Sequence, residues 1–328
     1  MVCTHAPPAV ASDSGVAGIG VLLSFVITAI IALAISASLV FQEARGRTST
    51  RKPSVLRRKL LNAYSDQQIL TGIGIQSVGL AKIRSLVPYH FFIIWMLSLL
   101  SMAVHNASLL ALVHDFRRDW VLRWLRQFLI FVNLVLSSFY GIFILEAVKD
   151  RINDSTFPIN CVWQGNDGSG QPPTQNIYLS YVGTIAVIIG NVAVFVLATW
   201  YLHSRTQRFY KIVQIVGLLL MMAIAIGAIV RVSLLADAFH GYHPIKLSDG
   251  GERQWSFGQL LSVGMLLLPV VSIIEILRGE IKYAPPVADP GDDKTSLLGD
   301  NELQAHPQDR ASFQPNPFFG SQTNLFRK

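Results

Sequence analysis

The chain has 328 residues, of which 51% are hydrophobic and only 14% charged, and its formal net charge is +7. Soluble domains contain about 25% charged residues, so this composition favours a protein that lies in a lipid bilayer. On so apolar a chain we expect the basic excess to set membrane orientation, which excludes nucleic acid as a partner. Two cysteines are too few for a Cys-rich zinc site or a disulfide-dense framework.

The first apolar segment opens with SDSGVAGIGVLLSF, residues 12–25. Its glycines run G-x-x-G-x-G with no strand-like segment before them, which excludes a dinucleotide-binding loop. Residues 1–15 contain no Lys or Arg, and the apolar run over 16–41 is too long for a cleaved signal peptide. It is long enough to cross a bilayer of about 30 Å. We expect a transmembrane helix that is capped by Ser12, Asp13 or Ser14 and packs closely on a neighbour through its small residues.

Six further apolar segments follow, at residues 67–86, 89–113, 124–147, 178–201, 212–236 and 256–277. The second of the seven is the most polar, because Gln76, Lys82 and Arg84 interrupt it, and Ser65 with Gln68 fits a capping box at its start. The sequence therefore predicts an all-α polytopic membrane protein. A short outer segment (1–15) precedes a bundle of seven transmembrane helices (16–278).

Lys and Arg residues are unevenly divided between the loops. The loops after the first, third and fifth spans hold fourteen, and the loops on the other side hold six. By the positive-inside rule the N-terminus lies outside and the C-terminus in the cytoplasm. Residues 279–328, rich in Pro, Asp, Gln and Ser, are expected to form a disordered cytoplasmic tail. Its DKTSLL and NPF stretches fit sorting signals, although such short patterns also occur by chance in disordered tails. The predicted location is the plasma membrane or an endomembrane (endosome, vacuole or ER).

Two features of the predicted outer side agree with this orientation. Asn153 begins an N-x-S sequon, which is glycosylated only on the lumenal or extracellular side. Cys3 and Cys161 fall on the same oxidising side, where they either form a disulfide or remain two free thiols.

Polar side chains recur at helical spacing within several spans. In the third span Ser98, Ser101, His105 and Ser108 fall on one face. Polar residues inside a membrane face the bundle interior, where they bind a ligand or hydrogen-bond between helices at about 0.6 kcal/mol per pair. The candidate ligand-binding residues are His105, Ser101, Asn133, Tyr140, Asn191 and Gln259.

Glu146 and Glu275 are the candidate catalytic acids, because they are the only carboxylates within the predicted spans. The alternative for each is an interfacial ion pair with Lys149 or Arg278. No Lys that could bind retinal lies in the last span, HGYH is a single histidine pair, and Asp-rich and Walker motifs are missing. The sequence therefore predicts neither a metal nor a cofactor.

Four blocks resemble a known family: SDSGVAGIGV, YSDQQILTGIGI, YHFFIIWMLSLLSMAVH and WSFGQLLSVGMLLLPVVSIIE. In this order they resemble the recurring blocks of an uncharacterised family of seven-span integral membrane proteins from filamentous fungi. The resemblance covers spans one, two, three and seven, and implies a fungal origin and a seven-span core without an activity. The binding or structural positions in these blocks are Asp13, Asp66, Gln67, His90, His105, Gln259 and Glu275.

Three functions remain open. The first is a receptor-like protein that binds a small apolar ligand between spans three to seven and a cytoplasmic partner at the basic inner loops and tail. Its third span ends HDFRRDW and its seventh lacks Asn-Pro-x-x-Tyr, so it does not resemble rhodopsin-like receptors in its motifs. The second is a membrane-embedded, terpene-cyclase-like enzyme acting on a lipid or isoprenoid substrate in a fungal metabolite pathway. The third is a membrane scaffold.

Overall fold

The computed structural model describes residues 9–45, 52–113, 120–148, 156, 158–159, 177–203, 209–239 and 247–278. All of them lie in one compact unit, residues 1–287, and the second unit, 288–328, lies outside the described residues. Within the described residues the secondary structure is helical, apart from an isolated parallel bridge between Val10 and Leu247. The prediction of an all-α fold is confirmed.

Six long helices and one broken helical segment make up the described bundle. The long helices are α1 (Ile19–Ala44), α2 (Lys52–Ala81), α3 (Pro88–Ala111), α5 (Trp120–Val148), α7 (Ile177–His203) and α8 (Tyr210–Leu235). The last segment consists of α9 (Phe257–Gly264), a 3-10 turn η2 (Met265–Leu267) and α10 (Leu268–Leu277), and a second 3-10 turn, η1 (Asp237–Phe239), follows α8.

Five of these helices, α1, α3, α5, α7 and α8, are long and apolar enough to cross a membrane. The chain therefore has the features of a multi-pass membrane protein. The helix α2 carries too many polar residues to meet the same criterion, and the apolar helix from Phe257 is too short for it. The prediction of seven spans thus exceeds the five that length and composition identify.

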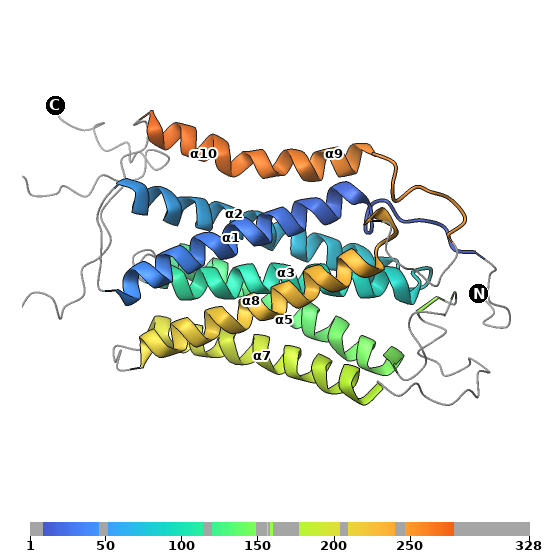
Figure 1. Ribbon diagram of the computed structural model, residues 1–328, viewed down its shortest axis with the longest axis horizontal. Coiled ribbons are helices and arrows are strands. Elements are labelled where there is room, and N and C mark those ends of the chain that lie inside the picture. Colours follow the sequence, from blue (N-terminus) through green and yellow to red (C-terminus); the bar gives the residue numbers. More distant parts are fainter. Residues whose placement is uncertain are drawn as a thin grey trace, which may run out of the picture. The chain divides into compact units, whose positions relative to one another are not determined.

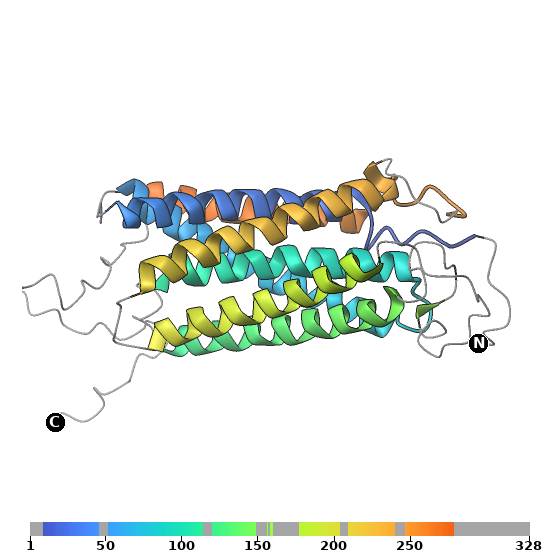
Figure 2. The ribbon, with the colours of Figure 1, turned by 60° about the horizontal axis from the view of Figure 1, so that its bottom comes forward.

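The helix α3 lies at the centre of the bundle, in contact with α1, α2, α5, α7 and α8 (Figures 1 and 2). All of its side chains are buried except that of Phe92, which is half-buried. The outer faces of α5, α7 and α8 expose large apolar side chains such as Phe128, Trp200 and Ile226. Exposed apolar surface of this extent is expected where a protein faces lipid.

Two predicted helix starts are wrong. The first helix begins at Ile19 after Gly18, which makes no side-chain cap, while Asp13 instead accepts hydrogen bonds from Val16 and Ala17 through its backbone oxygen. The second helix begins at Lys52, so Ser65 and Gln68 lie in its interior rather than at its start. In neither case does the local capping pattern mark the residue at which the helix begins.

Close packing by small residues of the first span is confirmed. A Cβ added to Gly20 would lie 2.7 Å from Cβ of Gln259, and one added to Gly18 would clash with the same side chain. Glycine therefore lets α1 approach α9 directly. The break in this last segment falls just before Pro269, which has no N–H to donate and whose ring disfavours a regular preceding turn.

Candidate functional site

A polar cluster lies in the middle of the bundle, where α2, α3 and α5 meet. We call Ser65, Gln68, Ser101, His105 and Asn133 the core cluster. The His105 ring is 3.3 Å from Ser65 Oγ at Nδ1 and 2.9 Å from Ser101 Oγ at Nε2. Ser101 Oγ donates to the Gln68 backbone oxygen at 3.0 Å and accepts from Asn133 Nδ2 at 3.1 Å.

These bonds fix how the Ser101 hydroxyl is used. It donates to the Gln68 carbonyl, so it can only accept from His105, and Nε2 therefore carries a hydrogen. On the other side of the ring, Nδ1 lies 3.3 Å from Ser65 Oγ, which also lies 3.0 Å from Ser108 Oγ. The ring is thus held between Ser65 of α2 and Ser101 of its own helix.

Further bonds continue from the core cluster toward the C-terminal end of α2. Gln76 Nε2 donates to the Gly72 oxygen at 2.9 Å and to Asn133 Oδ1, and the Tyr140 hydroxyl donates to the Gln76 backbone oxygen at 2.7 Å. A Cβ at Gly72 would clash with Ser101 Oγ, and one at Gly79 with the Tyr140 hydroxyl. Only glycine at these positions lets α3 and α5 lie so close to α2.

Three amide oxygens of α2 lack hydrogen-bond partners, those of Gln67, Gln68 and Gln76, and the last two lie on the face of α2 that also carries Ser65 and Gly72. Oε1 of Gln68 and Oε1 of Gln76 are buried without a donor, in side chains that are 2% and 0% exposed. Leaving such an acceptor unpaired costs about 1–3 kcal/mol. The α2 side of the core cluster can therefore accept a hydrogen bond from a bound hydroxyl or N–H group.

The structure brings together four of the six predicted ligand-binding residues. Ser101, His105, Asn133 and Tyr140 all lie between α2, α3 and α5. The other two lie elsewhere. The Asn191 side chain accepts from Asn106 Nδ2 at 3.4 Å between α3 and α7, and Gln259 Oε1 accepts from the Gly20 N–H at 3.2 Å near the start of α1.

The remaining predicted site residues lie outside the described residues: the side chains of Glu146 and Glu275, and Asn153, Cys3 and Cys161. The catalytic, glycosylation and disulfide assignments for them stay predictions. The enzyme hypothesis depends on the two carboxylates, and the scaffold hypothesis depends on the tail. Among the described residues there is no group of three or more His, Cys, Asp or Glu that could hold a metal ion.

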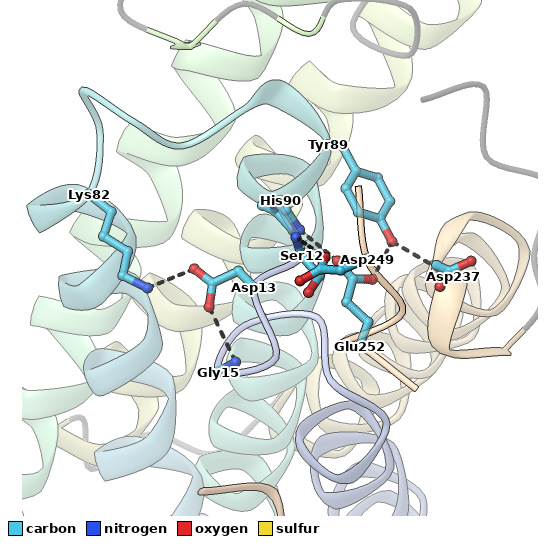
Figure 3. A network of polar contacts seen from close by, with 9 residues as sticks. All are labelled: Ser12, Asp13, Gly15, Lys82, Tyr89, His90, Asp237, Asp249 and Glu252. Carbon is cyan, nitrogen blue, oxygen red and sulfur yellow. Dashed lines mark hydrogen bonds and ion pairs between the residues drawn. The ribbon is translucent and has the colours of Figure 1, made fainter. Parts of the chain in front are cut away.

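A second, charged cluster lies at the end of α3 where residue 88 begins the helix (Figure 3). Glu252, fully buried in the segment before α9, accepts from the Tyr89 hydroxyl at 3.0 Å through Oε2. Its Oε1 lies 2.7 Å from His90 Nε2, in a side chain only 2% exposed. The Tyr89 oxygen in turn accepts from the backbone N–H of Asp237 at 3.0 Å, and Arg253 pairs with the Asp237 carboxylate at 2.6 Å. We call these five residues the Glu252 cluster.

Two segments that are far apart in the sequence come together beside the Glu252 cluster. We call residues 9–18 and 247–256 the cap. Ser12 N–H donates to Asp249 Oδ1 at 2.9 Å, and Ile19 N–H donates to the Glu252 backbone oxygen at 3.1 Å. The bond from Ser12 holds the pKa of the exposed Asp249 carboxyl below its ordinary value. Asp13 also pairs with Lys82 at 2.7 Å, which ties the cap to the turn after α2 (Figure 3).

The opposite end of α3 is held by α8 and α1. Tyr210 and Gln214 of α8 both donate to the Leu110 backbone oxygen, at 2.7 and 2.9 Å, which satisfies a carbonyl that the helix end would otherwise leave free. Gln214 Nε2 also donates to Glu43 of α1 at 3.0 Å. At the same end Arg126 of α5 bonds to α2 through Asp66.

Sequence reasoning missed the contribution of α2 and of Glu252. Ser65, Gln68, Gly72, Gln76 and Gly79 recur at spacings of three and four, which places them on one face of a helix, so this signal was present. For Glu252 no local signal exists, because its partner His90 is 162 residues away in the sequence.

No protein-family model, curated protein or solved structure matches this chain. The resemblance to the fungal seven-span family therefore stays a prediction.

Proposed function

We propose that the chain is a seven-span receptor-like membrane protein, with its N-terminus outside, that binds a small and largely apolar ligand. Five spans follow from length and composition. For the two additional spans, α2 has 30 residues, about 45 Å at 1.5 Å per residue, and it packs against both α1 and α3. The segment 257–277 packs against α1 and α2 in the same way. The imbalance of Lys and Arg between the loops supports the orientation.

The observation that carries ligand binding is the pair of buried amide oxygens beside the core cluster. Gln68 Oε1 and Gln76 Oε1 have no donor, while the hydroxyl, imidazole and amide groups around them are already bonded to one another. A ligand with one hydroxyl or N–H group would supply the missing donor. The rest of the ligand is apolar, because the helices that surround α3 are themselves apolar.

The cap favours a ligand that arrives through the bilayer. Residues 9–18 and 247–256 are tied to each other and to α3 by the bonds of Ser12, Ile19 and Glu252. The flanks of α5, α7 and α8 are instead apolar and exposed. An apolar molecule concentrates in the membrane, so it meets the bundle from this side.

Signal transfer would run through α3. This helix contacts the Glu252 cluster at one end, the core cluster in its middle and α8 at the other end. A ligand that favours one position of α3 over another shifts the population of the whole bundle. The basic loops and the tail at the inner end are then the surface for a cytoplasmic partner.

The first test measures ligand-induced stabilisation. The purified protein in lipid nanodiscs is screened for thermal unfolding against apolar compounds in pairs that differ by one hydroxyl group. A ligand at 100 times its Kd stabilises the folded protein by about 2.7 kcal/mol. We expect Gln68→Leu to abolish this shift without lowering the midpoint of the free protein, because its Oε1 has no partner to lose.

The matched control is Asn191→Leu, an amide removed on the other side of α3. It should lower the midpoint of the free protein but keep the ligand shift. Equal shifts in the wild-type and Gln68→Leu proteins, or no shift with any compound of the set, would reject ligand binding at the core cluster.

Topology is tested separately by glycosylation mapping. Asn153→Gln should remove a glycan if the loop after α5 is outside, and acceptor sites inserted at 46–51 or 204–208 should stay unmodified. Modification at the inserted sites would reverse the proposed orientation.

A further inference from the structure

An open groove runs along the outer surface of α7. It is lined by Phe195, Val196, Thr199, Trp200 and His203 and has a volume of about 560 Å³. This volume falls within the range of about 300–1,000 Å³ that is usual for small-molecule sites. The groove is distinct from the core cluster, because its lining residues lie on the face of α7 that points away from α3 or borders α5.

The residues that line this groove all belong to α7, and two of them make aromatic contacts with α5. The rings of Phe131 and Phe195 are 6.3 Å apart, and those of Trp124 and His203 are 5.4 Å apart. Since α5 and α7 each advance by about two turns between these contacts, they frame a stretch of about 10–12 Å. Between them the side chains of Phe128 and Trp200 are 60% and 69% exposed. The groove thus has aromatic walls and opens toward the lipid.

A polar group lies at the inner end of the groove. His203 Nδ1 is 2.9 Å from the Thr199 backbone oxygen, which can only accept, so Nδ1 carries the hydrogen of the neutral ring. The exposed ring therefore offers Nε2 as a hydrogen-bond acceptor. Trp124 and Trp200 beside it are residues that favour the membrane–water boundary.

We infer that this groove binds a membrane sterol, with its hydroxyl group donating to His203 Nε2 and its fused rings lying against Trp200 and Phe195. A rigid ring system loses less conformational entropy on binding than an acyl chain does, so it suits a shallow aromatic groove. The hydroxyl of a sterol lies at the membrane–water boundary, the depth at which Trp200 and His203 are expected.

The test is photolabelling with a sterol probe that keeps its free 3β-hydroxyl. The full-length protein in phosphatidylcholine nanodiscs is irradiated with the probe, and the labelled peptides are mapped by mass spectrometry. We expect labelling within 124–131 and 195–203, with competition by unmodified sterol and weaker competition by its 3α epimer. His203→Phe should lower labelling about fivefold, the effect of one lost hydrogen bond.

Two variants and one control complete the test. Trp200→Ala removes a wall of the groove and Val196→Trp fills it without removing any group, and both should reduce labelling about tenfold, in line with the apolar area involved. Leu219→Ala, an equally lipid-exposed position on α8, should change nothing. Size-exclusion profiles and unfolding midpoints confirm that each variant is folded.

Four outcomes would overturn the inference. These are even labelling over the exposed faces of α5, α7 and α8, wild-type labelling in Val196→Trp, equal competition by added phospholipid, and covalent links between two copies of the chain through the groove. The third would assign the groove to acyl chains and the fourth to a second protomer.

Discussion

The core cluster and the Glu252 cluster both hold α3 in place, but they are built in opposite ways. The core cluster consists of neutral groups, and two buried amide oxygens beside it have no donor. The Glu252 cluster is charged, and both oxygens of its central carboxylate are bonded. The first arrangement leaves two acceptors without a donor, whereas the second bonds both Glu252 oxygens to α3 and so fixes the cap. Under the proposed function, binding and anchoring are separated along one helix.

The Glu252 cluster should be the more sensitive of the two to substitution. Among the described residues, His90→Leu leaves the buried Glu252 carboxylate with Tyr89 as its one side-chain partner, and removing one partner of a buried carboxylate costs about 3–5 kcal/mol. We expect this loss in the free energy of unfolding, measured by thermal or denaturant unfolding in nanodiscs.

The double variant His90→Leu/Glu252→Met is its control. It removes both polar partners, so it should be more stable than His90→Leu alone. If the two variants are equally unstable, the effect comes from packing, and the contrast between the clusters is lost.

Glycines of α2 test how tightly the core cluster region is packed. Gly79→Ala places a Cβ against the Tyr140 hydroxyl, and overpacking of this kind costs about 1–3 kcal/mol. Gly74→Ala in the same helix has no atom within 4 Å of the added Cβ, and should be neutral or stabilising by up to about 1 kcal/mol. The same unfolding measurement compares them, and equal effects would show that α2 does not pack on α5 as described.

The smallest expected effect is a pH dependence of the cap. The Ser12 N–H lowers the pKa of Asp249, so the bond stabilises the folded state above the ordinary pKa of an aspartate and is lost as the pH falls through the lowered value. The difference in unfolding midpoint between wild type and Asp249→Asn should be small at pH 7 and vanish once the pH has fallen below the lowered pKa of Asp249. A difference that grows with acidity would contradict this assignment.

The part of the site that helical spacing alone determines could be predicted from the sequence. Ser101, His105, Asn133 and Tyr140 lie on inward faces, and a periodicity of 3.6 residues is visible without any knowledge of neighbours. The same periodicity does not say which helix lies opposite. For that reason the sequence predicts Asn191 beside His105, whereas in the structure it bonds to Asn106.

The rest depends on contacts between distant segments. Glu252 is buried because it contacts Tyr89, His90 and the start of α1. No local sequence pattern predicts contacts between segments so far apart. The sequence does not reveal the role of α2, because its polar composition is unfavourable for a helix that crosses a membrane. In the bundle, polar groups of α2 bond to α3 instead. The predicted start of the second helix is wrong for a related reason, since the capping pattern at Ser65 lies inside a longer helix.

The complete burial of α3 also bears on how the chain is made. It has the lowest mean hydropathy of the five candidate spans, yet it is the one most thoroughly surrounded by protein. During synthesis it emerges before α5, α7 and α8, the helices that later cover it. Until they arrive, its serines and His105 face lipid or the insertion machinery, at a cost that only the finished bundle removes. A nascent chain that stops after α3 should therefore be recognised by membrane quality control, while one that continues through α8 should escape it.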